Sequence, residues 1–134
     1  MELADFEGSW VVARQIRNAV GPDYVFDGRA VFARDREGLV YREEGQMRTE
    51  GSAPMAARRV YLWRQGDAGI EVFFEDGRFF HLIGPGAEVS AGHDCAPDRY
   101  DVQYDFRDWP VWSSVWEVSG PRKSYRMESV FRRE

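Results

Sequence analysis

Apolar and polar side chains alternate along most of the chain, and a period of two is typical of β-strands that bury one face. The pattern is clearest over residues 99–106, where aromatic or apolar side chains take every second position and polar ones stand between them. Helical spacing is confined to one turn over residues 3–7, which Gly8 ends. The pattern therefore predicts an all-β protein with a short N-terminal helical turn.

Turn-forming residues divide this alternating pattern into about ten strands. Asp76-Gly77 is the sharpest hairpin signal. The expected strands cover residues 10–17, 25–34, 39–47, 57–64, 70–75, 78–83, 88–95, 99–106, 112–119 and 123–132. Short connections favour antiparallel neighbours, and closure of the meander removes two exposed edges. We expect an antiparallel up-and-down barrel of about ten strands that forms one domain over residues 1–134.

Alternation also predicts which side chains face the interior, and that interior contains polar groups. The expected inward polar set is Arg14, Tyr41, Glu43, His93, Tyr100, Tyr104, Ser114 and Tyr125. Unpaired buried polar groups cost roughly 1–3 kcal/mol each, so these either satisfy one another or face a hydrated cavity. The strand number favours the cavity, because a barrel of this size is not filled by its own side chains.

For two of the expected strands, the alternation does not decide which face points inward. Residues 57–64 present either Arg59, Tyr61 and Trp63 or the opposite face with Val60 and Leu62. Residues 78–83 present either Phe79 with His81 or Phe80 with Leu82.

Composition narrows the class of protein. The net charge is −5 with both signs scattered along the chain, and no basic stripe is present, which argues against nucleic-acid binding. Cys95 is the only cysteine, so an intrachain disulfide is impossible and a reducing compartment is expected. No leader pattern and no apolar run of membrane-spanning length occur. We expect a soluble, cytoplasmic monomer or homodimer without membrane or nucleic-acid partners.

Three groups of residues suggest chemistry. Arg14, Lys123 and Tyr125 suggest a site for an anion, although Arg14 and Glu43 can equally form a structural pair. His81, His93 and Cys95 are the only soft metal ligands in the chain, and with a water they would suit zinc or iron. The alternative, which we favour, is that both histidines are hydrogen-bonded pocket or loop residues and that Cys95 is ordinary core.

A known pattern begins at Gly8-Ser9-Trp10. A Gly-x-Trp that opens the first strand after a helical turn resembles the calycin superfamily, which includes lipocalins, fatty-acid-binding proteins and nitrobindin-like barrels. The resemblance implies that Trp10 closes one end of the barrel and that an arginine of the last strand packs across it, with Arg132 the nearest match and Arg126 second. It also implies that an inward histidine can hold haem, as in nitrobindin-like proteins. The Lys123-x-Tyr125 spacing is similar to the basic-x-Tyr pair that binds carboxylates in fatty-acid-binding proteins.

A longer set of segments is similar to a bacterial family known as domain of unknown function 6314. The resemblance covers essentially the whole chain and implies a calycin-like barrel without an assigned activity. The segments that carry it are Asp5 to Trp10, Arg59 to Trp63, Asp76 to His81, His93 to Tyr100 and Gly120 to Lys123.

These observations favour a small-molecule-binding barrel over an enzyme. The ligand is expected to be partly apolar with an acidic or polar end. No cofactor is expected, with haem or zinc as the alternative, and a hydrolase or isomerase that uses His and Tyr is the third hypothesis. The expected ligand-binding residues are Arg14, Tyr41, Glu43, His81, His93, Tyr100, Tyr104, Trp116, Lys123 and Tyr125.

Overall fold

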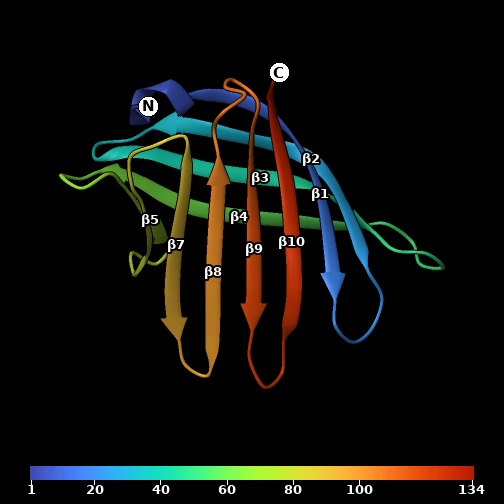
Figure 1. Ribbon diagram of the computed structural model, residues 1–134. Helices are drawn as coiled ribbons and strands as arrows, with labels where there is room; N and C mark the ends of the chain where they lie inside the picture. Colours follow the sequence, from blue (N-terminus) through green and yellow to red (C-terminus); the bar gives the residue numbers. More distant parts are fainter.

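The computed structural model describes residues 1–134 and contains ten antiparallel strands and one 3₁₀ turn (Figure 1). The elements are η1 (Leu3–Phe6), β1 (Gly8–Asn18), β2 (Tyr24–Arg34), β3 (Gly38–Arg48), β4 (Met55–Gln65), β5 (Ile70–Phe74), β6 (Phe79–Ile83), β7 (Glu88–Cys95), β8 (Asp98–Asp105), β9 (Trp112–Ser119) and β10 (Ser124–Arg133). The ends of the predicted strands differ from these by no more than two residues. The all-β prediction is confirmed.

All ten strands belong to one sheet in the order β6-β5-β4-β3-β2-β1-β10-β9-β8-β7. β1 pairs with both β2 and β10, so the first and last strands join the two halves of the meander. In Figure 1 the strands β2 to β4 cross behind β8 to β10, and both termini lie at one end. The sheet curls until β6 and β7 approach each other, but no ladder joins them. The result is a nearly closed barrel, as the turn pattern predicted, with an unpaired β6/β7 seam.

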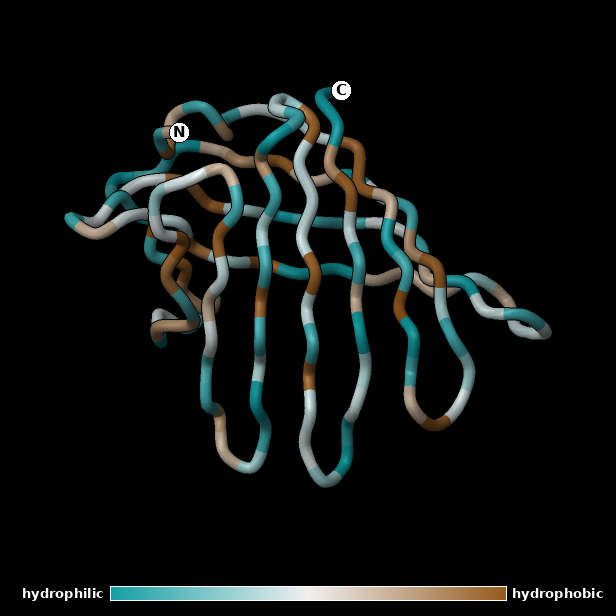
Figure 2. Tube along the Cα trace, in the orientation of Figure 1, coloured by the Kyte–Doolittle hydropathy of each residue, from teal (hydrophilic) through white to brown (hydrophobic).

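Inward positions follow the predicted alternation closely. Trp10, Val12, Arg14 and Ile16 of β1 are all buried, and the residues between them are exposed. Figure 2 shows the same alternation of apolar and polar positions along the strands of both halves. Burial of one apolar face on every strand supplies the core of the molecule.

The two undecided strands resolve in different ways. β4 turns Arg59, Tyr61 and Trp63 inward. In β6 neither alternative holds, because the register shifts opposite Val72 and Phe73 and buries Phe80 and His81, which are consecutive. A β-bulge of this kind adds one residue to a strand and breaks the alternation of faces.

An aromatic cluster closes the end of the barrel that carries the termini. Trp10 is fully buried and donates its indole N–H to the Phe6 carbonyl at 2.9 Å, which fixes η1 over this end. The guanidinium of Arg133 lies 4.0 Å from the Trp10 ring centroid and donates to the Glu7 carbonyl. The expectation that Arg132 packs across Trp10 is therefore wrong. Arg132 lies opposite Val11, and alternation turns it to the outside.

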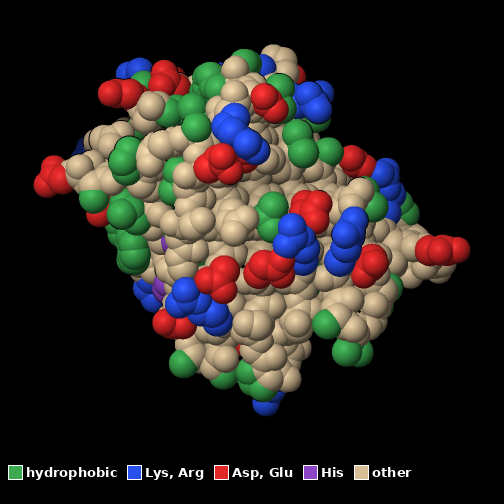
Figure 3. Space-filling model, viewed as in Figure 1, with side chains coloured by type: hydrophobic (Ala, Val, Ile, Leu, Met, Phe, Trp, Pro, Cys, Tyr) green, Lys and Arg blue, Asp and Glu red, His purple; other side chains and the backbone are tan.

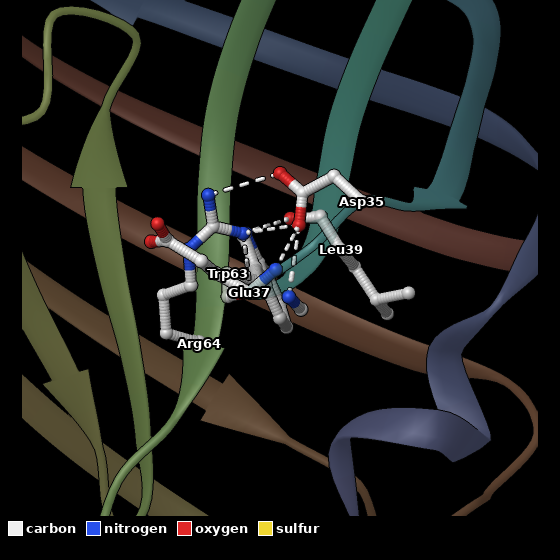
Figure 4. A network of polar contacts seen from close by, with 6 residues as sticks. Asp35, Glu37, Leu39, Trp63 and Arg64 are labelled. Carbon is white, nitrogen blue, oxygen red and sulfur yellow. Dashed lines mark hydrogen bonds and ion pairs between the residues drawn. The ribbon is translucent and has the colours of Figure 1, made fainter.

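A second arginine stabilises the turn between β2 and β3 at the same end. Arg64 of β4 donates two hydrogen bonds to Asp35 and also pairs with Glu37 (Figure 4). Backbone N–H groups of Glu37 and Gly38 donate to Asp35 as well, and these bonds with the Arg64 charge lower the pKa of Asp35.

Charges of both signs cover the outer surface. On the face in Figure 3, Lys and Arg side chains lie beside Asp and Glu rather than in a patch of one sign. Several are ion pairs, such as Arg126 with Glu117 and Arg107 with Asp105. No helix is long and apolar enough to cross a membrane.

Candidate functional site

The interior of the barrel holds a partly open cavity lined mainly by aromatic rings. Its volume is about 30 Å³, measured as the space open to the centre of a water molecule, which is room for roughly two waters. The lining residues are Arg14, Tyr41, Glu43, Arg59, Tyr61, Trp63, Val72, Phe80, His81, Tyr104, Trp112, Ser114, Trp116, Met127 and Phe131. The expected polar interior therefore exists, but side chains fill more of it than the strand number suggested.

Arg14 and Glu43 form a buried, fully bonded ion pair on one wall of the cavity. Two nitrogens of Arg14 donate to the two Glu43 oxygens at 2.6 and 2.7 Å, and its Nε donates to Ser129 at 2.7 Å. The Tyr41 hydroxyl donates to Glu43 as well. The bidentate geometry is the strong form of this contact. Of the two roles expected for Arg14, an anion site or a structural pair with Glu43, the structure shows the pair.

The pKa values in this network keep the pair ionised. Burial works to raise the pKa of Glu43, but the hydrogen bonds and charge of Arg14 outweigh it and hold that pKa below its usual value. Burial, together with the Glu43 charge, raises the pKa of Tyr41 well above its ordinary value. The network therefore holds one positive and one negative charge and a neutral phenol near pH 7.

His81 and Tyr104 form a second polar contact across the β6/β7 seam. The Nε2 atom of His81 lies 2.8 Å from the Tyr104 hydroxyl, while its Nδ1 atom is buried and has no partner. Burial lowers the pKa of His81 to about 3, with a smaller contribution from the His93 charge. The same desolvation raises the pKa of Tyr104 far above its normal range. Both groups are neutral at pH 7.

Trp112 provides another unsatisfied group in the cavity lining. Its indole Nε1 is buried and has no acceptor, although the ring is well packed and stacks on Phe131 at 3.8 Å. An unpaired buried donor costs roughly 1–3 kcal/mol. His81 and Trp112, both residues of the cavity lining, thus each carry a buried polar atom without a partner in the protein.

The structure separates the expected ligand-binding residues into two groups. Six of them line the cavity, namely Arg14, Tyr41, Glu43, His81, Tyr104 and Trp116. The other four, His93, Tyr100, Lys123 and Tyr125, lie outside it. Lys123 is exposed and binds the Tyr100 hydroxyl at 3.2 Å and Asp98 at 3.3 Å, so it does not reach the Arg14 network.

Sequence reasoning missed several residues of the lining as candidates for the site. The most consequential is Arg59, a half-buried cation whose guanidinium carbon lies 5.6 Å from the Trp116 ring centroid. Alternation left two possible inward faces for β4, and Arg59 and Tyr61 belong to one of them. The burial of Trp63 against Phe6 and Phe32 decides between them.

The candidate metal ligands do not gather into a site. No group of three or more His, Cys, Asp or Glu side chains is placed to hold a metal ion. His93 instead packs against the rings of Phe74 and Phe80. A haem macrocycle does not fit a space of about 30 Å³, and His81 Nε2 is already engaged by Tyr104. The residues present therefore fit neither a metal ion nor a haem.

Comparison with known proteins identifies a structure of similar fold and the family of the chain. No curated protein matches the sequence. Among solved structures, the S-type phycobiliprotein lyase CPES from Guillardia theta is similar with a TM-score of 0.69 and 8% sequence identity. The match covers 100% of this chain and 93% of that one, which supports the barrel architecture over the whole length. The model of DUF6314, a family of unknown function, matches residues 6–133, and the chain therefore belongs to that family.

Proposed function

We propose that the protein is a small-molecule-binding barrel whose ligand is partly apolar and carries an acidic or polar end. The observation that carries this proposal is the cavity itself, whose aromatic walls contain two buried polar atoms without partners, His81 Nδ1 and Trp112 Nε1. Binding sites for small molecules typically combine such apolar walls with a few placed polar groups. The fold shared with a phycobiliprotein lyase supports the proposal at the level of architecture alone.

The small volume of the cavity limits how a ligand enters. Because about 30 Å³ is open, a ligand larger than a few atoms has to displace rim side chains or extend into the groove outside. That groove has a volume of about 480 Å³ and shares Arg59 and Tyr61 with the cavity. The two spaces together suit a molecule that places one end inside.

The pKa values favour binding over acid–base catalysis. A general acid or base works best when its pKa lies near the working pH. The pKa of His81 is lowered to about 3, and that of Tyr104 is raised far above neutrality. Neither group exchanges a proton readily at pH 7. The single cysteine agrees with a cytoplasmic setting, where thiols stay reduced.

Native mass spectrometry of protein purified from its own host tests the proposal. We expect the wild type to carry a small molecule. Ser114→Leu, which places a larger side chain in the cavity, should lose it, whereas Ser113→Leu on the outer face of the same strand should keep it. Circular dichroism checks that both variants fold. A folded wild type that carries no small molecule, and gains no thermal stability from any compound of a metabolite library, would contradict the proposal.

A further inference from the structure

Arg59 differs from every other charged residue of the cavity lining because it has no ion-pair partner. The lining contains three charged side chains, Arg14, Arg59 and Glu43. Arg59 lies directly across from Glu43 in the β3–β4 ladder, but both oxygens of that carboxylate accept hydrogen bonds from Arg14. The charge of Arg59 still helps to lower the pKa of Glu43, and no hydrogen bond or ion pair joins the two side chains. The ion pairs of the structure do not include Arg59.

The cavity therefore carries an uncompensated positive charge. The guanidinium groups of Arg14 and Arg59 contribute two positive charges and Glu43 contributes one negative charge. His81 is neutral because burial lowers its pKa to about 3, and Tyr41, Tyr61 and Tyr104 stay protonated because burial raises their pKa values. The balance is one positive charge inside a protein whose net charge is −5. A half-buried cation of this kind favours a negatively charged ligand.

Arg59 also occupies the place where a ligand would pass from the outside to the inside. It lines the internal cavity and the outer groove, in which Tyr61 and Phe74 provide apolar surface. Two carboxylates lie along the groove, but Asp76 pairs with Arg78, and neither Asp76 nor Glu75 forms an ion pair with Arg59. The Arg59 guanidinium carbon lies 5.6 Å from the Trp116 ring centroid, which is within reach of a cation–π contact. Its charge and a hydrogen bond also act on Tyr61 and work against the rise in the pKa of that phenol.

We propose that Arg59 binds the negatively charged end of the ligand and that the ligand is a monoanionic carboxylate with an apolar or aromatic body. This inference rests on the proposed binding function and identifies the substrate class. The anion site that the sequence suggested at Arg14, Lys123 and Tyr125 is thereby reassigned to Arg59. Arg14 is satisfied by Glu43, and Lys123 is exposed beside Asp98. One carboxylate neutralises the single free charge and matches the planar edge of a guanidinium.

A pair of probes that differ in charge tests the assignment. 1-Naphthoate and 1-naphthamide share one ring system, and their binding can be followed by isothermal titration and by quenching of tryptophan fluorescence. We expect the wild type to bind naphthoate about 10- to 100-fold more tightly than naphthamide, as a charge-assisted contact would give. Arg59→Gln should abolish that preference and leave naphthamide affinity unchanged.

Arg58→Gln is the matched control. Arg58 precedes Arg59 in β4, is exposed, and lines a different groove on the outer face of the sheet. The substitution removes the same charge, so an effect of net charge alone would appear in both variants. We expect Arg58→Gln to keep the preference for naphthoate, and thermal unfolding verifies that both variants are folded.

The outcomes separate this inference from the binding function on which it rests. If both probes bind the wild type equally, or Arg59→Gln keeps the preference, Arg59 is not the anion site although the barrel binds small molecules. If neither probe binds, the charge of the compound that co-purifies from the native host tests the inference instead. A neutral compound overturns the inference, and an anionic compound lost from Arg59→Gln supports it. If no compound is found and neither probe binds, both proposals fail.

Discussion

At the scale of single residues, the burial of Arg14 and Glu43 explains how a polar interior is compatible with a stable fold. Alternation along β1 and β3 predicted that both side chains point inward, and both are buried. The sequence left open whether a ligand or Glu43 satisfies Arg14, because contacts across a barrel depend on strand register. In the structure the pair is complete without a ligand. Removal of one partner therefore leaves a buried charge uncompensated.

Glu43→Gln is expected to destabilise the protein by about 3–5 kcal/mol, the usual cost of breaking a buried ion pair from one side. The amide keeps the shape of the carboxylate but cannot neutralise Arg14. Urea unfolding at pH 7 measures the change. Glu44→Gln, one residue away on the exposed face, should change the free energy of unfolding by less than about 0.5 kcal/mol. The double variant Arg14→Met with Glu43→Leu should recover most of the loss, and equal losses in the double and single variants would refute this account.

His81 should make the stability depend on pH in mildly acidic solution. Its pKa is about 3 in the folded protein against an ordinary value of 6.5, so the unfolded chain binds the proton first. The free energy of unfolding therefore falls as pH drops below about 6.5, by about 2 kcal/mol between pH 7 and pH 5. Glu43 has a lowered pKa, so its contribution is complete above its ordinary value and is lost only at lower pH. The window from pH 7 to pH 5 thus isolates the histidine.

Urea midpoints at pH 7 and pH 5 provide the measurement. His81→Gln should flatten the dependence by about 2 kcal/mol, since glutamine does not titrate. Phe79→Gln, at an exposed position of the same strand without a titratable group, serves as the control and should keep the wild-type slope. An unchanged slope in His81→Gln would show that other groups cause the pH dependence.

At the scale of elements, β6 shows where a rule of strict alternation fails. The sequence offered Phe79 with His81 or Phe80 with Leu82, and the bulge opposite Val72 and Phe73 buries Phe80 and His81 instead. Nothing in five consecutive residues of this strand specifies a bulge, because its position depends on how β5 and β6 twist together. His81 is thus turned inward by tertiary structure rather than by local pattern.

A close crossing of β2 and β3 provides a prediction for one element pair. Gly28 and Gly45 lie opposite each other in the ladder, and the Phe26 ring covers both. A methyl group on Gly28 would overlap the Glu44 carbonyl oxygen. Gly28→Ala should therefore cost about 1–3 kcal/mol or more by overpacking. Gly84→Ala, where no atom lies within 4 Å of the added methyl, should stay within about 1 kcal/mol of the wild type in the same urea experiment.

At the scale of the whole molecule, the sequence predicted the fold class better than the details of closure. Alternation and regularly spaced turns were sufficient for ten antiparallel strands, because both are local signals. The resemblance to calycins implies Arg132 at the closed end, whereas alternation from the buried Phe131 points to Arg133, which is the arginine that packs on Trp10. The open seam and the small cavity depend on how ten strands curl together, which no short segment encodes.

The β6/β7 seam is where the barrel should open most easily. Side chains alone close it, through the 2.8 Å contact of His81 with Tyr104 and the packing of His93 against Phe80, while β1 is hydrogen-bonded on both sides. Strands with one unpaired edge and few bonds unfold locally at low free energy. Hydrogen–deuterium exchange should therefore be faster in peptides from residues 79–83 and 88–95 than in peptides from residues 8–18 and 124–133. His81→Phe, which removes the polar contact, should speed exchange at the seam without affecting β1. Equal protection of all four segments would mean that the barrel is closed as firmly at this seam as elsewhere.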